Sequence, residues 1–144
     1  MFKPLFVIYM PSYNQDYHYG KSKETFVINH LAKYFKQTIV PNSNRFALFD
    51  AESETTLYEI KSRRCCKGTY PTTIVPLNKL CVKTNKQICF VFYFNDGIYY
   101  IHYIKDLFDT FETRMITYFR SGIDNVGVNH ICIPVELLKP LLVC

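Results

Sequence analysis

The chain has 144 residues, of which 49% are hydrophobic and 20% are charged. This length suffices for one domain, residues 1–144, whose core needs neither disulfides nor a structural metal. The net charge of +5 favours a polyanionic partner. With five glycines in the whole chain and no glycine-rich phosphate loop, the sequence argues against a nucleoside-triphosphate-binding protein.

The N-terminal ten residues contain one short apolar run, Leu5 to Met10, which Pro11 closes. This run is too short for the hydrophobic region of a secretory signal or for a membrane span. We interpret it as a buried strand or a segment strapped across the domain. The sequence therefore predicts a soluble, intracellular protein of the cytoplasm or nucleus, with no membrane partner.

The first half of the chain predicts a helix followed by a pair of strands. Residues 11–21 are turn-rich and polar-aromatic, which predicts a loop. Ser22 can cap a helix that continues to about Lys36, with its apolar residues on one face. Arg45 to Asp50 and Thr56 to Ser62 resemble strands, and the short polar segment between them makes an antiparallel pair the simplest arrangement.

The second half of the chain predicts further strands and a second helix. The segment 63–76 is basic and turn-forming, and Asn95-Asp96-Gly97 predicts a hairpin turn. The remaining predicted elements are a short helical stretch over 77–83, a strand buried on both faces over 87–94, a strand over 98–104, a helix over 106–119 ended by Gly122, and a strand near 129–133. This order is typical of a mixed α/β sheet domain.

Three polar residues of the predicted strand pair carry the candidate chemistry. Side chains alternate along a strand, so Glu59 and Lys61 project to one side and Ile60 to the other. Asp50, at the end of the first strand, then lies within side-chain reach of Glu59. Mg²⁺ is held by one or two carboxylates plus water and substrate phosphate, and the backbone carbonyl of Ile60 offers a further oxygen. Lys61 is placed to orient the attacking water or to neutralise charge on the transition state.

The pattern of Asp50 followed by Glu59-Ile60-Lys61 resembles the core motif of the PD-(D/E)XK nuclease superfamily. Glu24, on the preceding helix, matches the acidic residue that the family has there. The resemblance covers about residues 20–105 and is closest to small Holliday-junction resolvases and virus-type nucleases. It implies a restriction-endonuclease-like fold, a mixed central sheet flanked by helices. It also implies structure-specific hydrolysis of DNA with Mg²⁺ or Mn²⁺ by a homodimer, with Glu24 as a third carboxylate on the metal.

A basic cluster follows the motif and predicts contacts with nucleic-acid phosphates on either side of the cleaved bond. Its members are Arg63, Arg64, Lys67, Lys79 and Lys83, and Lys21 and Lys23, just ahead of Glu24, can add to the same rim. Lys79 stands out because it follows the site on a short helix. For each of the others, a solvated surface charge is the simpler interpretation. We expect the predicted strand 98–104 or helix 106–119 to supply the dimer interface.

Other interpretations remain open at the level of sequence. Glu59 and Lys61 also fit the solvated outer face of a hairpin, and Glu24 also fits an acid in the first turn of a helix, where the dipole favours it. The same fold could serve as a non-catalytic nucleic-acid-binding or protein-interaction module, and the same metal site could cleave RNA. A zinc site is conceivable from Cys65, Cys66, His130 and Cys132, although their spacing matches no zinc motif. Cys81 and Cys89 are expected as core side chains, all six cysteines as free thiols, and His102 as a sheet residue.

Overall fold

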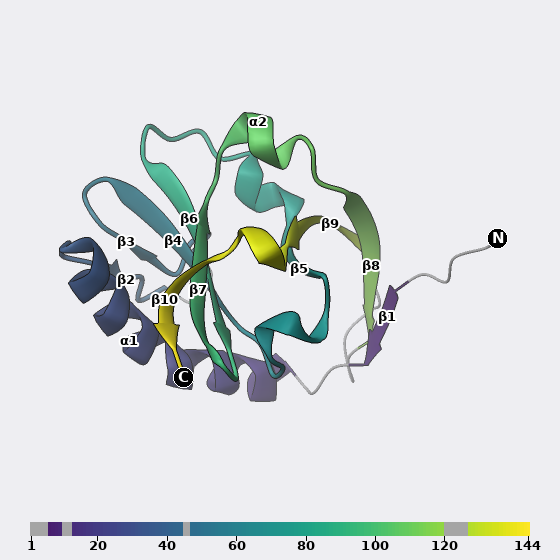
Figure 1. The fold of residues 1–144 in the computed structure, drawn as a ribbon, viewed down its shortest axis with the longest axis horizontal. Coiled ribbons are helices and arrows are strands. Elements are labelled where there is room, and N and C mark those ends of the chain that lie inside the picture. The colour runs from purple at the N-terminus through teal and green to yellow at the C-terminus, as the bar shows by residue number, and fades with distance from the viewer. Residues whose placement is uncertain (1–5, 10–12, 45–46, 120–126) are drawn as a thin grey trace.

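Strand β6 (Gln87–Phe94) is apolar on both faces, and the fold is built around it. The computed structural model describes residues 6–9, 13–44, 47–119 and 127–144. One face of β6 packs against a long helix and the other against a second sheet, so the molecule has a helix layer and two sheet layers (Figure 1). The fold is mixed α/β and consists mostly of strands.

The larger sheet has six strands in the order β10-β7-β6-β4-β3-β2. β4 and β6 run parallel, and the other neighbours are antiparallel. The bounds of the remaining strands are β2 Val40–Pro41, β3 Ala51–Glu52, β4 Thr56–Ser62, β7 Gly97–His102 and β10 Lys139–Val143. The predicted strands over 56–62 and 87–94 and the hairpin at Asn95-Asp96-Gly97 are confirmed.

The smaller sheet has four strands in the order β1-β8-β9-β5, with β1 parallel to β8. The bounds are β1 Phe6–Tyr9, β5 Thr72–Pro76, β8 Thr113–Phe119 and β9 Gly127–Pro134. The strand expected near 129–133 is confirmed within β9, and the apolar N-terminal run does form a strand. The fold further contains the short helix α2 (Lys105–Phe108) and the 3-10 turns η1 (Lys67–Thr69), η2 (Leu77–Leu80) and η3 (Val135–Leu137).

Helix α1 (Tyr13–Phe35) lies along one face of the larger sheet. Its buried residues Val27, Ile28 and Leu31 pack against Tyr58 and the apolar side chains of β4 and β6. The loop predicted over 11–21 is wrong from Tyr13 onward, and residues 11 and 12 lie outside the described part. Ser22 therefore lies inside the helix and not at its N-terminus. Polar and turn-forming residues disfavour a helix only weakly, and tertiary packing of the same helix can override this local preference.

The opposite face of the larger sheet packs against the smaller one. Phe90 and Phe92 of β6 are fully buried there beside Val75 of β5 and Ile133 of β9, and Phe108 of α2 closes one end. A sheet and short turns cover this face of the larger sheet, and α1 covers the other. Among the described segments, no helix has the length and apolar content needed to cross a membrane.

Several predicted elements differ from the observed ones. The helix expected over 106–119 is wrong, since only α2 is helical and residues 113–119 form β8, paired on both edges. Gly122 lies outside the described part of the chain. Residues 63–76, expected as turns, include strand β5, and the short helix predicted over 77–83 ends at Leu80. Of the strand predicted over 45–50, residues 48–50 form a bend, residue 47 has no regular secondary structure, and residues 45–46 lie outside the described part of the chain.

The two segments expected at a dimer interface, the strand 98–104 and the helix 106–119, do not offer the surface that was predicted. Both edges of β7 are paired, with β6 and β10, and its side chains Ile98 and Ile101 are buried. Tyr100, on the same face as Ile98, packs edge-on against Tyr34 of α1, with the ring centroids 5.6 Å apart. The helix over 106–119 does not form. A homodimer remains a prediction that would need a different surface.

Candidate active site

The candidate site is built at the edge of β4, where its short partner strand ends. β3 pairs with Leu57 and Tyr58 of β4, and just beyond this pairing the side chain of Asp50 meets the strand edge. Oδ2 of Asp50 accepts a hydrogen bond from the backbone N–H of Ile60 at 2.7 Å. The N–H of Asp50 donates to the carbonyl of Tyr58 at 3.0 Å, which fixes the backbone position of Asp50. Asp50 therefore occupies the place that a longer β3 would fill.

Glu59 projects from β4 into the space between the sheets, with only 3% of its side chain exposed. Its two oxygens face two different lysines. Oε2 lies 3.2 Å from Nζ of Lys61, and Oε1 lies 3.4 Å from Nζ of Lys79. Burial raises the pKa of Glu59, the charge of Asp50 raises it further, and the two lysines oppose both effects. The interpretation of Glu59 as part of a solvated outer face is wrong, because the second sheet covers this side of β4.

Lys79 reaches Glu59 from η2, which follows the crossover strand β5. Its ammonium also donates to the carbonyl of Leu48 and lies 5.5 Å from the ring centroid of Phe49. With 14% of its side chain exposed, Lys79 belongs to the interior of the site rather than to a basic rim. The prediction that singled out Lys79 was right about proximity to the site, and the structure adds its direct contact with Glu59.

Glu24 approaches the same edge from α1, which lies on the other face of the sheet. It forms an ion pair with Lys21 at 3.0 Å. Burial raises the pKa of Glu24, and a hydrogen bond and charge repulsion from Asp50 raise it further, against the opposing effect of Lys21. Since α1 begins at Tyr13, Glu24 is far from the first turn, and the alternative that explained this residue by the helix dipole is wrong.

Asp50 is the common neighbour of both glutamates. Glu24 lies on one face of the sheet and Glu59 on the other. The charge of Asp50 adds to the effect of burial in raising the pKa of each. Lys21, Lys61 and Lys79 lie against the outer acids. The site is thus a row of three carboxylates around one strand edge, flanked by three ammonium groups.

The residues of this row offer an oxygen-only donor set for a divalent cation. In the described part of the chain, no group of three or more His, Cys, Asp or Glu side chains is arranged to hold a metal ion. Mg²⁺ needs fewer, because it keeps several waters and uses one or two carboxylates. In a strand, the N–H and C=O groups of one residue point to the same edge. The carbonyl of Ile60 therefore lies on the edge where the N–H of Ile60 donates to Asp50. Asp50, Glu59 and this carbonyl fit a magnesium-type site.

Of the other predicted basic residues, Arg63, Arg64 and Lys67 follow the C-terminal end of β4, whereas Lys83 lies between η2 and β6. Arg64 and Lys83 are exposed. The backbone N–H of Lys67 donates to Oδ1 of Asp96 at 2.9 Å, and its ammonium lies 5.2 Å from the ring centroid of Tyr99. These positions place Lys67 at the β6–β7 hairpin rather than beside Asp50. Lys23 and Arg63 share a pocket.

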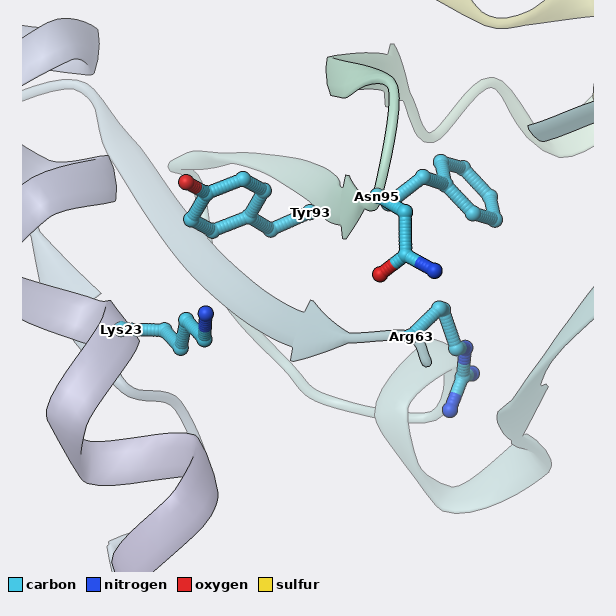
Figure 2. Close-up of a pocket in the computed structure, with 5 residues that line it drawn as sticks. Lys23, Arg63, Tyr93 and Asn95 are labelled. Carbon is cyan, nitrogen blue, oxygen red and sulfur yellow. The ribbon is translucent and has the colours of Figure 1, made fainter. Parts of the chain in front are cut away.

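This pocket, called here the Tyr93 pocket, has a volume of about 120 Å³. Its lining residues are Lys23, Arg63, Tyr93, Phe94 and Asn95. Figure 2 shows Lys23 extending from α1 on one side, Arg63 following the end of β4 on the other, and the Asn95 amide between them. Tyr93 and Asn95 were predicted in a strand and a hairpin turn, and neither was among the predicted site residues. The one available signal was Tyr93 itself, a hydroxyl-bearing residue near the end of an otherwise apolar strand.

The cysteines and histidines form no second site among the described residues. None of the six cysteines forms a disulfide, as predicted, and Cys89 is buried, but Cys81 is exposed and the expectation of a core side chain there is wrong. His130 is buried, and its Nδ1 lies 2.8 Å from the carbonyl of Val128. Burial lowers the pKa of His130, and the charges of Lys61 and Arg63 lower it further, against the hydrogen bond to Val128. The zinc alternative thus has no support, and His102 lies in β7 as expected.

Comparison with protein-family models, with curated proteins and with solved structures gives no match to this chain.

Proposed function

We propose that this chain is a metal-dependent nuclease of the PD-(D/E)XK type that hydrolyses phosphodiester bonds in DNA. The observation that carries the proposal is the hydrogen bond from the N–H of Ile60 to Asp50, at 2.7 Å. It joins the Asp of the motif to the strand that bears Glu59 and Lys61, although the pairing of β3 ends two residues earlier. The acid and the Glu-X-Lys sequence are therefore adjacent at one strand edge.

Asp50 and Glu59, with the carbonyl of Ile60, would hold Mg²⁺ or Mn²⁺. Such an ion polarises the scissile phosphate and lowers the pKa of a water bound to it. Glu24 would act as the third carboxylate, from the far side of Asp50. Burial raises the pKa values of Glu24 and Glu59, and repulsion from Asp50 raises both further; a divalent cation bound between these acids would relieve that repulsion.

Lys61 would act on the substrate side of the site. About a third of its side chain is exposed, whereas Glu59 beside it is buried. A partly exposed ammonium next to a buried carboxylate can orient a water or neutralise charge that develops on the phosphate. Lys79, buried on the other oxygen of Glu59, would keep that carboxylate ionised and correctly placed.

The test is cleavage of labelled duplex DNA, single-stranded DNA, flap, four-way junction and RNA, with and without Mg²⁺ or Mn²⁺. The parent is compared with Lys61→Ala and with Lys86→Ala as a matched control, because Lys86 pairs with Glu52 on the same sheet away from Asp50. We expect metal-dependent cleavage by the parent and by Lys86→Ala, and its loss in Lys61→Ala. Preference for the four-way junction would support a resolvase-like activity, and cleavage of RNA alone would make the chain a ribonuclease.

The second candidate is a non-catalytic nucleic-acid-binding or protein-interaction module on the same fold. The observation in its favour is that each oxygen of Glu59 lies within 3.4 Å of a lysine, so the carboxylate is already neutralised by the chain itself. Retained nucleic-acid binding by the folded parent without cleavage of any substrate would favour this module. Light scattering at micromolar concentration tests the homodimer, and a monomeric mass would contradict it.

A further inference from the structure

We propose that the Tyr93 pocket binds one unpaired nucleotide of the substrate strand, so that this nuclease acts on single-stranded or frayed nucleic acid. The inference rests on the proposed function only for cleavage; the binding itself is independent of it. Four features of the described residues support it: two cations from separate elements, a bounded volume, a partly exposed aromatic pair and the short span to Lys61.

The two cations of the pocket come from opposite sides of the strand end. Lys23 belongs to α1 and Arg63 directly follows β4, so the helix and the sheet together form the walls (Figure 2). The guanidinium of Arg63 is fixed by a hydrogen bond to the Ile74 carbonyl at 2.6 Å and one to Oγ1 of Thr73 at 3.2 Å. A cation already fixed in place loses little side-chain entropy on binding a phosphate. The Asn95 amide between the two cations can donate to a phosphate oxygen.

An aromatic pair adjoins these cations. Tyr93 and Phe26 of α1 stack with their ring centroids 5.5 Å apart and their planes 18° apart. Phe26 is 42% exposed, so part of this aromatic pair is open to solvent. The ammonium of Lys23 lies 5.3 Å from the Tyr93 ring centroid. Aromatic rings beside cations are the combination with which proteins bind single strands, because the bases stack and the phosphates pair.

The size and shape of the pocket favour an unpaired nucleotide over a continuous duplex. A hollow of about 120 Å³ admits a single group, not a helical groove. In a duplex the base faces are stacked on one another, and only phosphates, sugars and base edges are accessible. An unpaired base presents its π-face to an aromatic side chain. The partly exposed Phe26–Tyr93 pair would contribute nothing to duplex binding, whereas it would stabilise a bound single strand.

The pocket lies next to the candidate active site along the strand. Lys61 and Arg63 project from the same side of the chain two residues apart, a span of about 6.6 Å in extended backbone. That distance is comparable with one nucleotide step in an extended single strand. A strand whose phosphate occupies the pocket would therefore place its neighbouring phosphodiester near Lys61. The pocket would select the substrate, and the Asp50 edge would cleave it.

Binding is measured by fluorescence anisotropy with one short labelled oligonucleotide as single-stranded DNA, as single-stranded RNA and as DNA duplex. EDTA is present, so the assay does not depend on cleavage. We expect the parent to bind single strands more tightly than duplex. Tyr93→Leu should weaken single-strand binding roughly tenfold and leave duplex binding unchanged, while Tyr93→Phe should bind as the parent does. The two single strands show whether the pocket accepts deoxyribose, ribose or both.

Tyr70→Leu is the matched control, because Tyr70 is 63% exposed and lies outside the pocket. Thermal melting of each variant verifies folding. Unchanged single-strand binding in folded Tyr93→Leu, or equal weakening for single strand and duplex, would overturn the inference even if the parent cleaves DNA. Weakened single-strand binding in folded Tyr93→Leu, relative to a parent that binds single strands but cleaves nothing, would uphold the pocket and refute the nuclease.

Discussion

Lys79, on the connection that leads from β4 to β6, forms an ion pair with Glu59 of β4, with its Nζ 3.4 Å from Oε1 of Glu59. Both side chains are largely shielded from solvent, with 14% and 3% exposed. A buried carboxylate stays ionised only where opposite charge compensates for the lost hydration. Lys61 supplies the other compensating charge. The stability of this part of the fold is therefore linked to the ionisation of Glu59.

Lys79→Met should destabilise the protein by about 2 kcal/mol at pH 7.5. This is less than the cost of leaving a buried carboxylate with no cationic partner, because Lys61 still pairs with Glu59. The substitution raises the already raised pKa of Glu59 further. A carboxyl whose folded pKa exceeds its unfolded pKa stabilises the fold at low pH and loses that contribution as pH rises through the folded pKa. The deficit of the variant should thus shrink toward pH 5. Urea unfolding at both pH values measures it, with Lys83→Met as an exposed control in the same segment. An equal deficit at both values would mean that Lys79 acts through packing alone.

Asp50→Asn should preserve the fold but abolish metal-dependent cleavage. The amide oxygen can still accept the hydrogen bond from the N–H of Ile60, whereas the charge that would bind a divalent cation is lost. Asp50→Ala also leaves that N–H without its acceptor and should cost about 1–3 kcal/mol of stability. Urea unfolding and cleavage assays of both variants separate the two effects. Asp109→Asn is the control, since Asp109 pairs with Lys105 on the surface of α2. Full activity in Asp50→Asn would refute the metal site.

The approach of Asp50 to Glu59 was predictable because it depends on local pattern. Residues 56–62 alternate as a strand should, and a short polar segment before them leaves a hairpin as the simplest connection. The burial of Glu59 was not predictable in this way. It depends on β5 and β9, which come later in the chain and cover that face of β4. The same is true of Lys79, whose contact with Glu59 depends on where the crossover places η2.

The largest error, a helix in place of β8, has a related cause. In the segment 106–119, the apolar side chains Leu107, Phe111, Met115 and Tyr118 recur at helical spacing. Thr113, Ile116 and Thr117 are β-branched and favour a strand. Local sequence leaves this competition undecided, and pairing with β1 and β9 decides it. β1 is separated from β8 by most of the chain, so no short-range pattern reports the contact.

Gly97→Ala should destabilise the β6–β7 hairpin by more than about 1 kcal/mol. Gly97 has a φ of +148°, and a Cβ at this position would lie 2.3 Å from the carbonyl oxygen of Leu142 in β10. Backbone strain and the clash with a neighbouring strand act together. Gly68→Ala is the matched control, because a Cβ there meets nothing within 4 Å. Urea unfolding of the two variants measures the difference, and comparable stability would contradict the pairing of β10 with β7.

Glu24→Gln should make the protein more stable at pH 7 than the parent, by less than about 1 kcal/mol, the scale of a partly exposed ion pair. Burial raises the pKa of Glu24 above its ordinary value of 4.5, and Asp50 raises it further, so the ionised form is unfavourable in the folded state. Because the folded pKa is the higher one, the parent is relatively more stable below about pH 4.5 and loses this contribution as pH rises. The advantage of glutamine should therefore disappear as the pH falls. Urea unfolding between pH 4 and 7 measures this trend, with the exposed Glu112→Gln as control. A destabilised Glu24→Gln at pH 7 would show that the ion pair with Lys21 outweighs the repulsion from Asp50, and that the three carboxylates are not under mutual strain.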